Sequence, residues 1–134
     1  MAVFKASARN RDVTVMLAED ESMIRELIAT FLANLGYTVH EAENGRESLE
    51  QARKLNPKNV GLLITDLVMP VMGGLELASE LRKLNSTVKV LFISGYTDDV
   101  VILETEARSR TAFLRKPFSF DVLRQRIESL LAED

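Results

Sequence analysis

Hydrophobic positions along the chain alternate between two spacings. Apolar residues recur at every third or fourth position in several stretches, which is typical of one face of a helix. Between these stretches lie five short runs that are typical of strands, at residues 13–18, 38–42, 60–65, 89–93 and 112–115. All are mainly apolar except 38–42, in which only Val39 and Ala42 are apolar. Repeated alternation of strand and helix predicts five βα units, and therefore an α/β fold with a five-stranded parallel sheet covered by helices on both faces.

Residues at the borders of these segments support the division. Gly36 follows the first helical stripe, where a glycine in the left-handed conformation commonly ends a helix. Asn44, Thr97 and Ser119 can each cap the helix that follows, because their side chains accept hydrogen bonds from the free N–H groups at a helix start. The helix after Thr97 has the least regular pattern, since its apolar residues are consecutive, from Val100 to Leu103.

Polar residues follow the apolar runs at the points where the strands end. Glu19 and Asp20 come after the first run, Asp66 after the third, Ser94 after the fourth and Lys116 after the fifth. The third run is apolar almost throughout, which indicates a central strand buried on both faces. Because ligands of open parallel sheets bind outside the carboxyl ends of the strands, we expect these five side chains to meet at one edge.

The length and composition indicate one domain. A chain of 134 residues with 46% hydrophobic content is sized for a single core. We expect this domain to span residues 12–134. Residues 1–11 are small, polar and basic, and we interpret them as a flexible N-terminal tail or linker.

Charge and cysteine content exclude several function classes. A formal net charge of −3 gives no electrostatic basis for direct binding of nucleic acid or an anionic membrane. The absence of cysteine excludes disulfides and thiolate metal sites. No apolar stretch approaches the roughly 20 residues that span a bilayer, so we expect a cytoplasmic protein with no membrane contact.

Four motifs resemble those of a known family. They are Leu17–Glu21, Thr65–Pro70 with the following Met72–Gly74, Ser94–Tyr96, and Leu114–Phe118. In this order, each at the end of a predicted strand, they resemble the receiver domains of two-component response regulators and hybrid histidine kinases. The resemblance covers about Thr14 to Leu131 and implies a flavodoxin-like (βα)5 receiver fold.

The resemblance implies that Asp66 is the phospho-acceptor and that Glu19 and Asp20 are the acidic pair that serves Mg²⁺ or Mn²⁺. Mg²⁺ requires octahedral oxygen coordination and keeps several waters. Asp20, Asp66 and the backbone carbonyl of Val68 can supply the protein's share. Glu19 is longer than the aspartate frequent at this place, and we expect it to act through a bound water or to orient Asp20.

The resemblance also implies a switch. Ser94 would hydrogen-bond the phosphoryl group, Lys116 would pair with it, and Phe113 would be the aromatic residue that rotates inward. The changed surface would comprise the fourth helix, the last strand and the last helix, and it is also a possible homodimer contact. The donor would be a histidine kinase or a histidine phosphotransfer domain, so the protein would signal and assist only its own phosphorylation and dephosphorylation.

Three alternatives remain open at this point. An aspartyl phosphatase of the haloacid dehalogenase type also uses Mg²⁺, but it needs a second aspartate where this chain has Val68. A flavodoxin-like FMN carrier needs an anion-binding loop where this chain has the acidic run Glu19–Glu21. An interaction module could keep the fold and never be phosphorylated. The residues do not choose between a stand-alone receiver and part of a longer regulator or hybrid kinase, and they leave the cognate kinase, the oligomeric state and the phosphoryl lifetime open.

Overall fold

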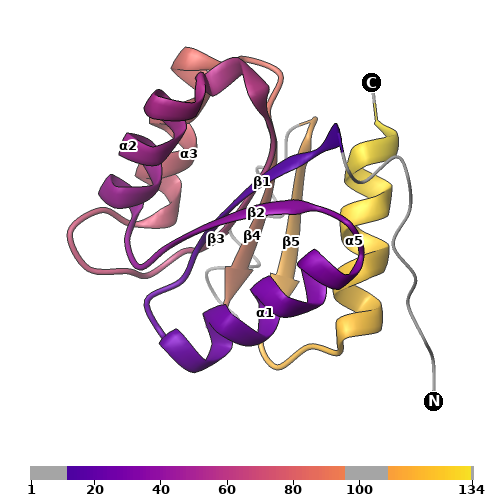
Figure 1. Ribbon diagram of the computed structural model, residues 1–134. Helices are drawn as coiled ribbons and strands as arrows, with labels where there is room; N and C mark the ends of the chain where they lie inside the picture. The colour runs from indigo at the N-terminus through magenta and orange to yellow at the C-terminus, as the bar shows by residue number, and fades with distance from the viewer. Residues whose placement is uncertain (1–11, 96–108, 134) are drawn as a thin grey trace.

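Five strands form one parallel sheet in the computed structural model of the chain, which describes residues 12–95 and 109–133 (Figure 1). The order across the sheet is β2-β1-β3-β4-β5. The strands are β1 (Thr14–Ala18), β2 (Thr38–Ala42), β3 (Val60–Asp66), β4 (Lys89–Ser94) and β5 (Thr111–Arg115). The predicted α/β fold with five parallel strands is therefore confirmed, and each predicted strand agrees with the observed one to within one residue at either end.

Helices cover both faces of the sheet. They are α1 (Ser22–Asn34), α2 (Gly45–Leu55), α3 (Gly74–Leu84) and α5 (Phe120–Ala132), with a short 3₁₀ helix, η2 (Pro57–Asn59). Figure 1 shows α2 and α3 together on one face and α1 and α5 on the other. The helix predicted after Thr97 lies outside the described residues.

The core is divided by the sheet into two hydrophobic clusters. Side chains of α1 and α5, such as Ile28 and Leu123, pack on the strand residues that face them. Leu77 of α3 belongs to the second cluster, which fills the space between the sheet and the helices α2 and α3. Adjacent residues of β3, Leu62 and Leu63, are completely buried on opposite faces. The expectation of a central strand buried on both sides is thus confirmed.

Helix ends follow the predicted signals at three places. Asn44 accepts a hydrogen bond from the Glu47 N–H at 2.9 Å, and Ser119 accepts one from the Val122 N–H at 3.1 Å. Gly36 has a φ of 103°, the left-handed conformation that glycine adopts readily. The 3₁₀ helix η2 was not predicted. It starts after a residue with a φ of 72°, where only the Asn-Pro pair signalled a break.

The edge of the sheet at which the strands begin, here called the amino edge, is closed by side chains that bind backbone oxygens. Asn85, after α3, donates to the carbonyls of Pro57 at 3.1 Å and Val60 at 3.0 Å. Lys89, at the start of β4, donates to the carbonyl of Leu131 at 3.1 Å near the end of α5. These bonds give side-chain donors to backbone acceptors near the ends of the helices and strands.

Candidate functional site

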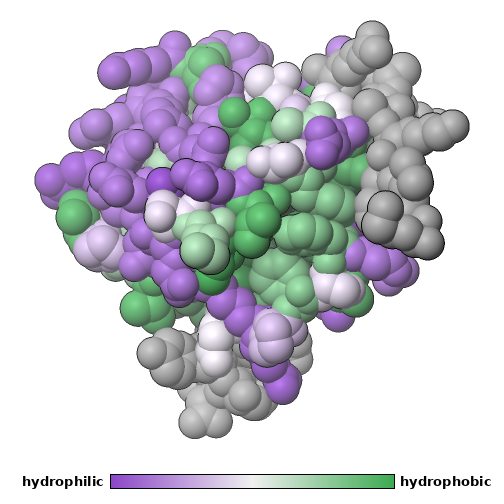
Figure 2. Space-filling model, turned by 60° about the horizontal axis from the view of Figure 1, so that its bottom comes forward, coloured by the Kyte–Doolittle hydropathy of each residue, from purple (hydrophilic) through white to green (hydrophobic). Residues whose placement is uncertain are grey.

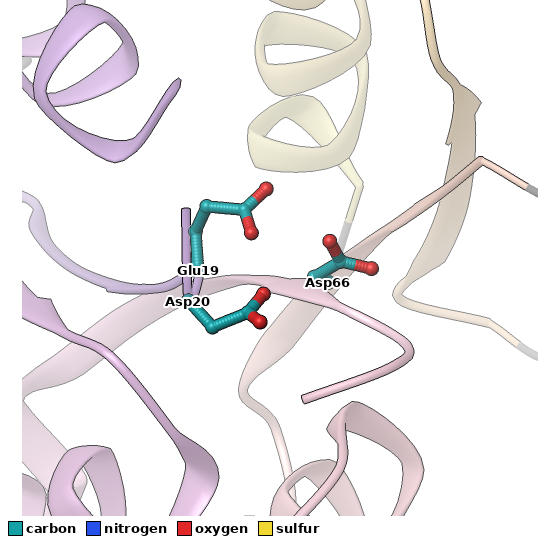
Figure 3. Close-up of side chains that lie close together, drawn as sticks. All are labelled: Glu19, Asp20 and Asp66. Atoms are coloured by element: carbon teal, nitrogen blue, oxygen red, sulfur yellow. The ribbon is translucent and has the colours of Figure 1, made fainter. Parts of the chain in front are cut away.

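Three carboxylates meet at the opposite edge, here called the carboxyl edge. Glu19 and Asp20 follow β1 directly, and Asp66 is the last residue of β3. Ala18 of β1 pairs with Thr65 of β3, so the residues that follow emerge side by side. One carboxylate oxygen from each acid lies within 4.8 Å of the other two. Figure 3 shows the Glu19 and Asp20 side chains directed towards Asp66, so the predicted convergence of the acids is confirmed.

Lys116 joins two of these acids. Its Nζ donates to Glu19 Oε1 and to Asp66 Oδ2, each at 2.7 Å, and lies 4.0 Å from Glu21 Oε1. Its backbone N–H donates to the carbonyl of Ser94 at 2.8 Å, which extends the pairing of β4 and β5 by one residue. The sheet therefore places one ammonium group between carboxylates that lie 97 and 50 positions away in sequence.

Burial changes the protonation of Glu19. Only 1% of this residue is exposed, and loss of hydration raises the pKa of its carboxyl from 4.5 to about 7. The negative charge of Asp66 also raises this pKa, while the hydrogen bond from Lys116 lowers it. Near neutral pH the site without a cation is therefore poised to hold an extra proton.

The positive charge of Lys116 is stabilised by its partners. Burial lowers the pKa of the Lys116 ammonium, but hydrogen bonds to Asp66 and Glu19 outweigh this effect and raise it above its usual range. Lys116 thus stays charged at neutral pH and offsets part of the negative charge of the cluster.

The turn after β3 packs tightly beneath Asp66. The Val68 N–H donates to Asp66 Oδ1 at 3.3 Å, and the Gly74 N–H donates to the carbonyl of Leu67 at 3.0 Å. A Cβ atom on Gly74 would lie 2.2 Å from the carbonyl oxygen of Asp66, well inside van der Waals contact. Glycine at this position therefore lets α3 begin directly against the backbone of the central carboxylate.

A strained residue lies in the same turn. Val71 has a φ of 68°, an uncommon conformation for a β-branched residue, and the Met72 N–H donates to the carbonyl of Pro70 at 2.7 Å across it. The carbonyl of Met72 in turn accepts from the Gly45 N–H at 2.9 Å at the start of α2. The sequence did not predict the positive φ of Val71, because the residues expected in that conformation are glycine and asparagine.

Ser94 and Phe113 lie where the sequence predicted them. Ser94 is the buried last residue of β4, one position beyond the residue that pairs with Asp66. Phe113 is buried in β5, and its ring stacks on Phe92 with centroids 5.7 Å apart and planes inclined by 19°. The ring thus occupies an inward position in this structure. The roles of Ser94 as a sensor and Phe113 as a switch stay predictions.

The donor set at the carboxyl edge fits a metal ion. Three carboxylates within 4.8 Å of one another offer only oxygen, the ligand that hard divalent cations prefer. Asp20 is exposed, whereas Glu19 and Asp66 are buried, so a cation would enter the site from the side of Asp20. The acidic cluster is therefore consistent with metal binding.

A hydrophobic area adjoins the cluster. Met23 and Leu27 are exposed on consecutive turns of α1. A hollow of about 410 Å³ is lined by Ile24 of the same helix and by Gly95, Lys116, Pro117 and Phe118. Figure 2, in which the bottom of Figure 1 comes forward, shows a hydrophobic area at the centre and a more hydrophilic surface to its left. The charged site thus lies beside apolar surface.

Comparison with known proteins defines the class. Residues 15–128 match the model of the response regulator receiver domain. The chain is 39% identical over 129 residues to the sensor kinase CckA of Brucella abortus, covering 96% of this chain and 14% of that protein. It is 32% identical to the response regulator receiver protein CpdR of the same organism, covering 87% of this chain and 95% of CpdR. The chain thus spans a small part of the first relative and nearly all of the second.

Solved structures agree with the sequence comparison. The crystal structure of the receiver domain from the hybrid histidine kinase CckA superposes with a TM-score of 0.75 at 33% identity, covering 88% of this chain and 98% of that one. The response regulator TrrA of Thermotoga maritima, in complex with Mg²⁺ and BeF, gives a TM-score of 0.75 at 32% identity, with 88% and 98% covered. The chain belongs to the response regulator receiver domain family and has its flavodoxin-like fold.

Membership in this family makes the chain a receiver domain of two-component signal transduction, as the four motifs predicted. Within the described residues, no helix is long and apolar enough to cross a membrane.

Proposed function

We propose that Asp66 accepts a phosphoryl group from a phosphohistidine of a partner histidine kinase or histidine phosphotransfer protein. The observation that carries this proposal is the position of Asp66, at the end of the central strand, with Lys116 at 2.7 Å and two further carboxylates beside it. Asp66 is 7% exposed, so its carboxylate is held by the fold yet open at the rim.

The reaction is a displacement at phosphorus. A carboxylate oxygen of Asp66 attacks, an acyl phosphate bond forms, the phosphorus–nitrogen bond to the donor breaks, and the histidine leaves as imidazole after gaining a proton from solvent. Positioning and charge neutralisation supply most of the catalysis in phosphoryl transfer. Lys116 contributes here because its ammonium already lies at the carboxylate and can pair with the transferred oxygens.

The metal in this proposal is Mg²⁺, with Mn²⁺ as a substitute. Asp20, Asp66 and the backbone carbonyl of Val68 would hold it, and Glu19 would act through a bound water or by orienting Asp20. When bound, the ion neutralises charge on the phosphoryl oxygens. The acidic cluster and the Mg²⁺ complex of the similar TrrA support this choice.

Phosphorylation would then act as a switch. Ser94 and Lys116 would be drawn to the new oxygens, and the position of Phe113 would respond to the movement of Ser94. The changed surface would include β5 and α5, together with the residues that follow Tyr96, and it is a possible homodimer contact. A local change of charge biasing two states of a packed element is the usual basis of such switches.

The organisation and location of the protein follow from the same proposal. We assign residues 12–134 to the receiver domain and residues 1–11 to a tail or linker. The domain would signal from the cytoplasm, where histidine kinases carry their phosphohistidine, and would assist only its own phosphorylation and dephosphorylation. The similarity to a sensor kinase supports an origin in a hybrid histidine kinase or its relay.

The test is incubation with Mg²⁺ and acetyl phosphate, followed by intact mass measurement. We expect one added phosphoryl group in the unaltered protein and none in Asp66→Asn. Asp12→Asn, which removes an exposed carboxylate just before β1, is the matched control and is expected to be phosphorylated normally. If the unaltered protein gains no phosphate, the receiver fold serves here as an interaction module. If Asp66→Asn still gains phosphate, another residue is the acceptor.

A further inference from the structure

Arg25, a residue of α1 outside the acidic cluster, connects the loop that carries Glu19 and Asp20 to the edge strand. Its Nη1 donates to the backbone oxygen of Glu19 at 2.7 Å, and its Nε lies 3.6 Å from Glu41 Oε1. The Arg25 side chain is 16% exposed, although it is a charged residue on a surface helix. An arginine held at this depth by two oxygens has a defined orientation.

The bond to Glu19 acts on Asp20 through the geometry of the backbone. The oxygen that accepts from Arg25 belongs to the peptide unit that joins Glu19 to Asp20. Because this unit is planar, fixing its oxygen also fixes the direction from Glu19 to the Cα of Asp20. A rotation of the free peptide would swing the Asp20 side chain away from Asp66.

The other end of the same residue is also anchored. The Glu19 N–H donates to the carbonyl of Ala42, at the end of β2, at 3.0 Å. The backbone of Glu41 is held in turn by the Gln51 side chain of α2, which donates to its carbonyl at 2.8 Å. Arg25 therefore completes a frame in which both backbone polar groups of Glu19 are bound to fixed elements.

The two contacts of Arg25 differ in strength. Glu41 has a side chain that is 43% exposed, and at 3.6 Å an ion pair of this kind contributes little. The bond to the Glu19 carbonyl is short and involves a charged donor, which makes it the stronger of the two. Arg25 contacts the backbone of Glu19 and none of the three carboxylates at hydrogen-bond distance among the described residues, so its effect is mainly geometric.

We infer that Arg25 is a positioning residue that orients the Glu19–Asp20 pair for a divalent cation. The inference rests on the proposed function, because it names the residue that prepares the metal site. Groups that orient metal ligands typically contribute 10- to 100-fold to metal affinity. Removal of Arg25 is therefore expected to raise the Kd for Mg²⁺ by about tenfold or more.

The experiment is calorimetric titration of Mg²⁺ into the full chain and into Arg25→Ala, Arg25→Lys and Arg53→Ala. Arg53 is exposed in the last turn of α2, so its removal controls for the loss of one positive charge. We expect a higher Kd in Arg25→Ala, a partial rescue in Arg25→Lys and no change in Arg53→Ala. In the metal-free proteins, the NMR amide signal of Asp20 is expected to shift in Arg25→Ala and not in Arg53→Ala.

A phosphorylation series separates positioning from general damage. With increasing Mg²⁺, Arg25→Ala should need about tenfold more metal for half-maximal phosphorylation by acetyl phosphate and reach nearly the same rate at saturation. An unchanged Kd in folded Arg25→Ala, beside normal Mg²⁺ binding by the unaltered chain, overturns this inference and leaves the proposed function standing. Failure of the unaltered chain to bind Mg²⁺ overturns both.

Discussion

The two edges of the sheet use polar side chains in different ways. At the amino edge, Asn85 and Lys89 donate to backbone carbonyls, so each polar side chain satisfies a fixed acceptor of the fold. At the carboxyl edge, Lys116 donates to the side chains of Glu19 and Asp66, and one cation faces more than one carboxylate. One edge is balanced within the chain, whereas the other carries excess negative charge.

The difference shows where stability has been exchanged for binding. A buried carboxyl with a pKa near 7 is costly to ionise, and a fold selected only for stability would have replaced it. Its retention beside Asp66 makes sense if a cation and a phosphoryl group complete the charge balance. Substitutions at the two edges should therefore affect different properties of the protein.

The largest difference is expected between two lysines. Lys116→Met removes the ammonium that faces Asp66, and loss of one such electrostatic contact typically lowers a rate by about 100- to 1000-fold. Lys89→Met removes donors to the end of α5 and should reduce stability while leaving phosphorylation nearly unchanged. Rates with acetyl phosphate and Mg²⁺, beside urea unfolding curves, measure both effects. Equal loss of phosphorylation in the two variants would remove the functional distinction between the edges.

The next effect is a dependence on pH. The pKa of Glu19 is raised from 4.5 to about 7 in the folded protein, so the folded state binds this proton more tightly than the unfolded state. Its contribution to the free energy of unfolding is therefore present below pH 4.5 and is lost as the pH rises through about 7, by about 3 kcal/mol.

Urea unfolding of the metal-free protein across this pH range measures the loss. The free energy of unfolding should fall less steeply with pH in Glu19→Gln than in the unaltered protein. Mg²⁺ should also reduce this pH dependence in the unaltered protein, because it favours the charged carboxylate. If Glu19→Gln and the unaltered protein show the same pH dependence of the free energy of unfolding, another group is responsible.

A smaller effect is expected from adding a methyl group at Gly61, near the start of β3, or at Gly74, the first residue of α3. Gly74→Ala places a Cβ 2.2 Å from the carbonyl oxygen of Asp66, and backbone must move to relieve the contact. We expect a loss of about 2 to 3 kcal/mol and slower phosphorylation. In Gly61→Ala, near the start of β3, the added Cβ lies 3.2 Å from the Val13 side chain and 3.8 Å from the Thr14 carbonyl oxygen, and the change should cost less than about 1 kcal/mol. Thermal unfolding of both variants tests the contrast, which fails if Gly61→Ala is the more damaging.

A modest effect, on stability alone, is expected from Asn85→Ala. This variant loses the hydrogen bonds to the carbonyls of Pro57 and Val60, and we expect a destabilisation of about 1 to 2 kcal/mol. Phosphorylation at a temperature where the variant stays folded should match that of the unaltered protein. A specific loss of phosphorylation would mean that the amino edge is coupled to the site.

Much of the fold and of the candidate site could be predicted from the sequence because both depend on local pattern. Apolar runs mark the strands, and residues that end parallel strands meet at one edge, which brought Asp66 together with the acids after β1. The position of Lys116 followed from the same rule. Four short motifs then identified the family.

Other features could not be predicted because they depend on contacts between distant elements. Arg25 looked like an ordinary helix residue, and its role appears only when its guanidinium is seen between the Glu19 carbonyl and Glu41. The strained conformation of Val71 goes against the preference of its own side chain, so it is held by the packing of the turn on Gly45 rather than by local sequence. The ring position of Phe113 likewise depends on Phe92, its pairing partner on the neighbouring strand β4.

The register of the strands limits how homologous chains can differ in length. Ala18 pairs with Thr65, and Ser94 pairs with Arg115, so each site residue sits at or just after a fixed pairing position. One inserted residue would move a side chain by about 3.3 Å along a strand and turn it to the other face. That shift exceeds the 2.7 Å bond between Lys116 and Asp66. Insertions and deletions during evolution should therefore collect in turns at the amino edge, such as Pro57–Asn59, and be absent from the last residues of β1, β3 and β5.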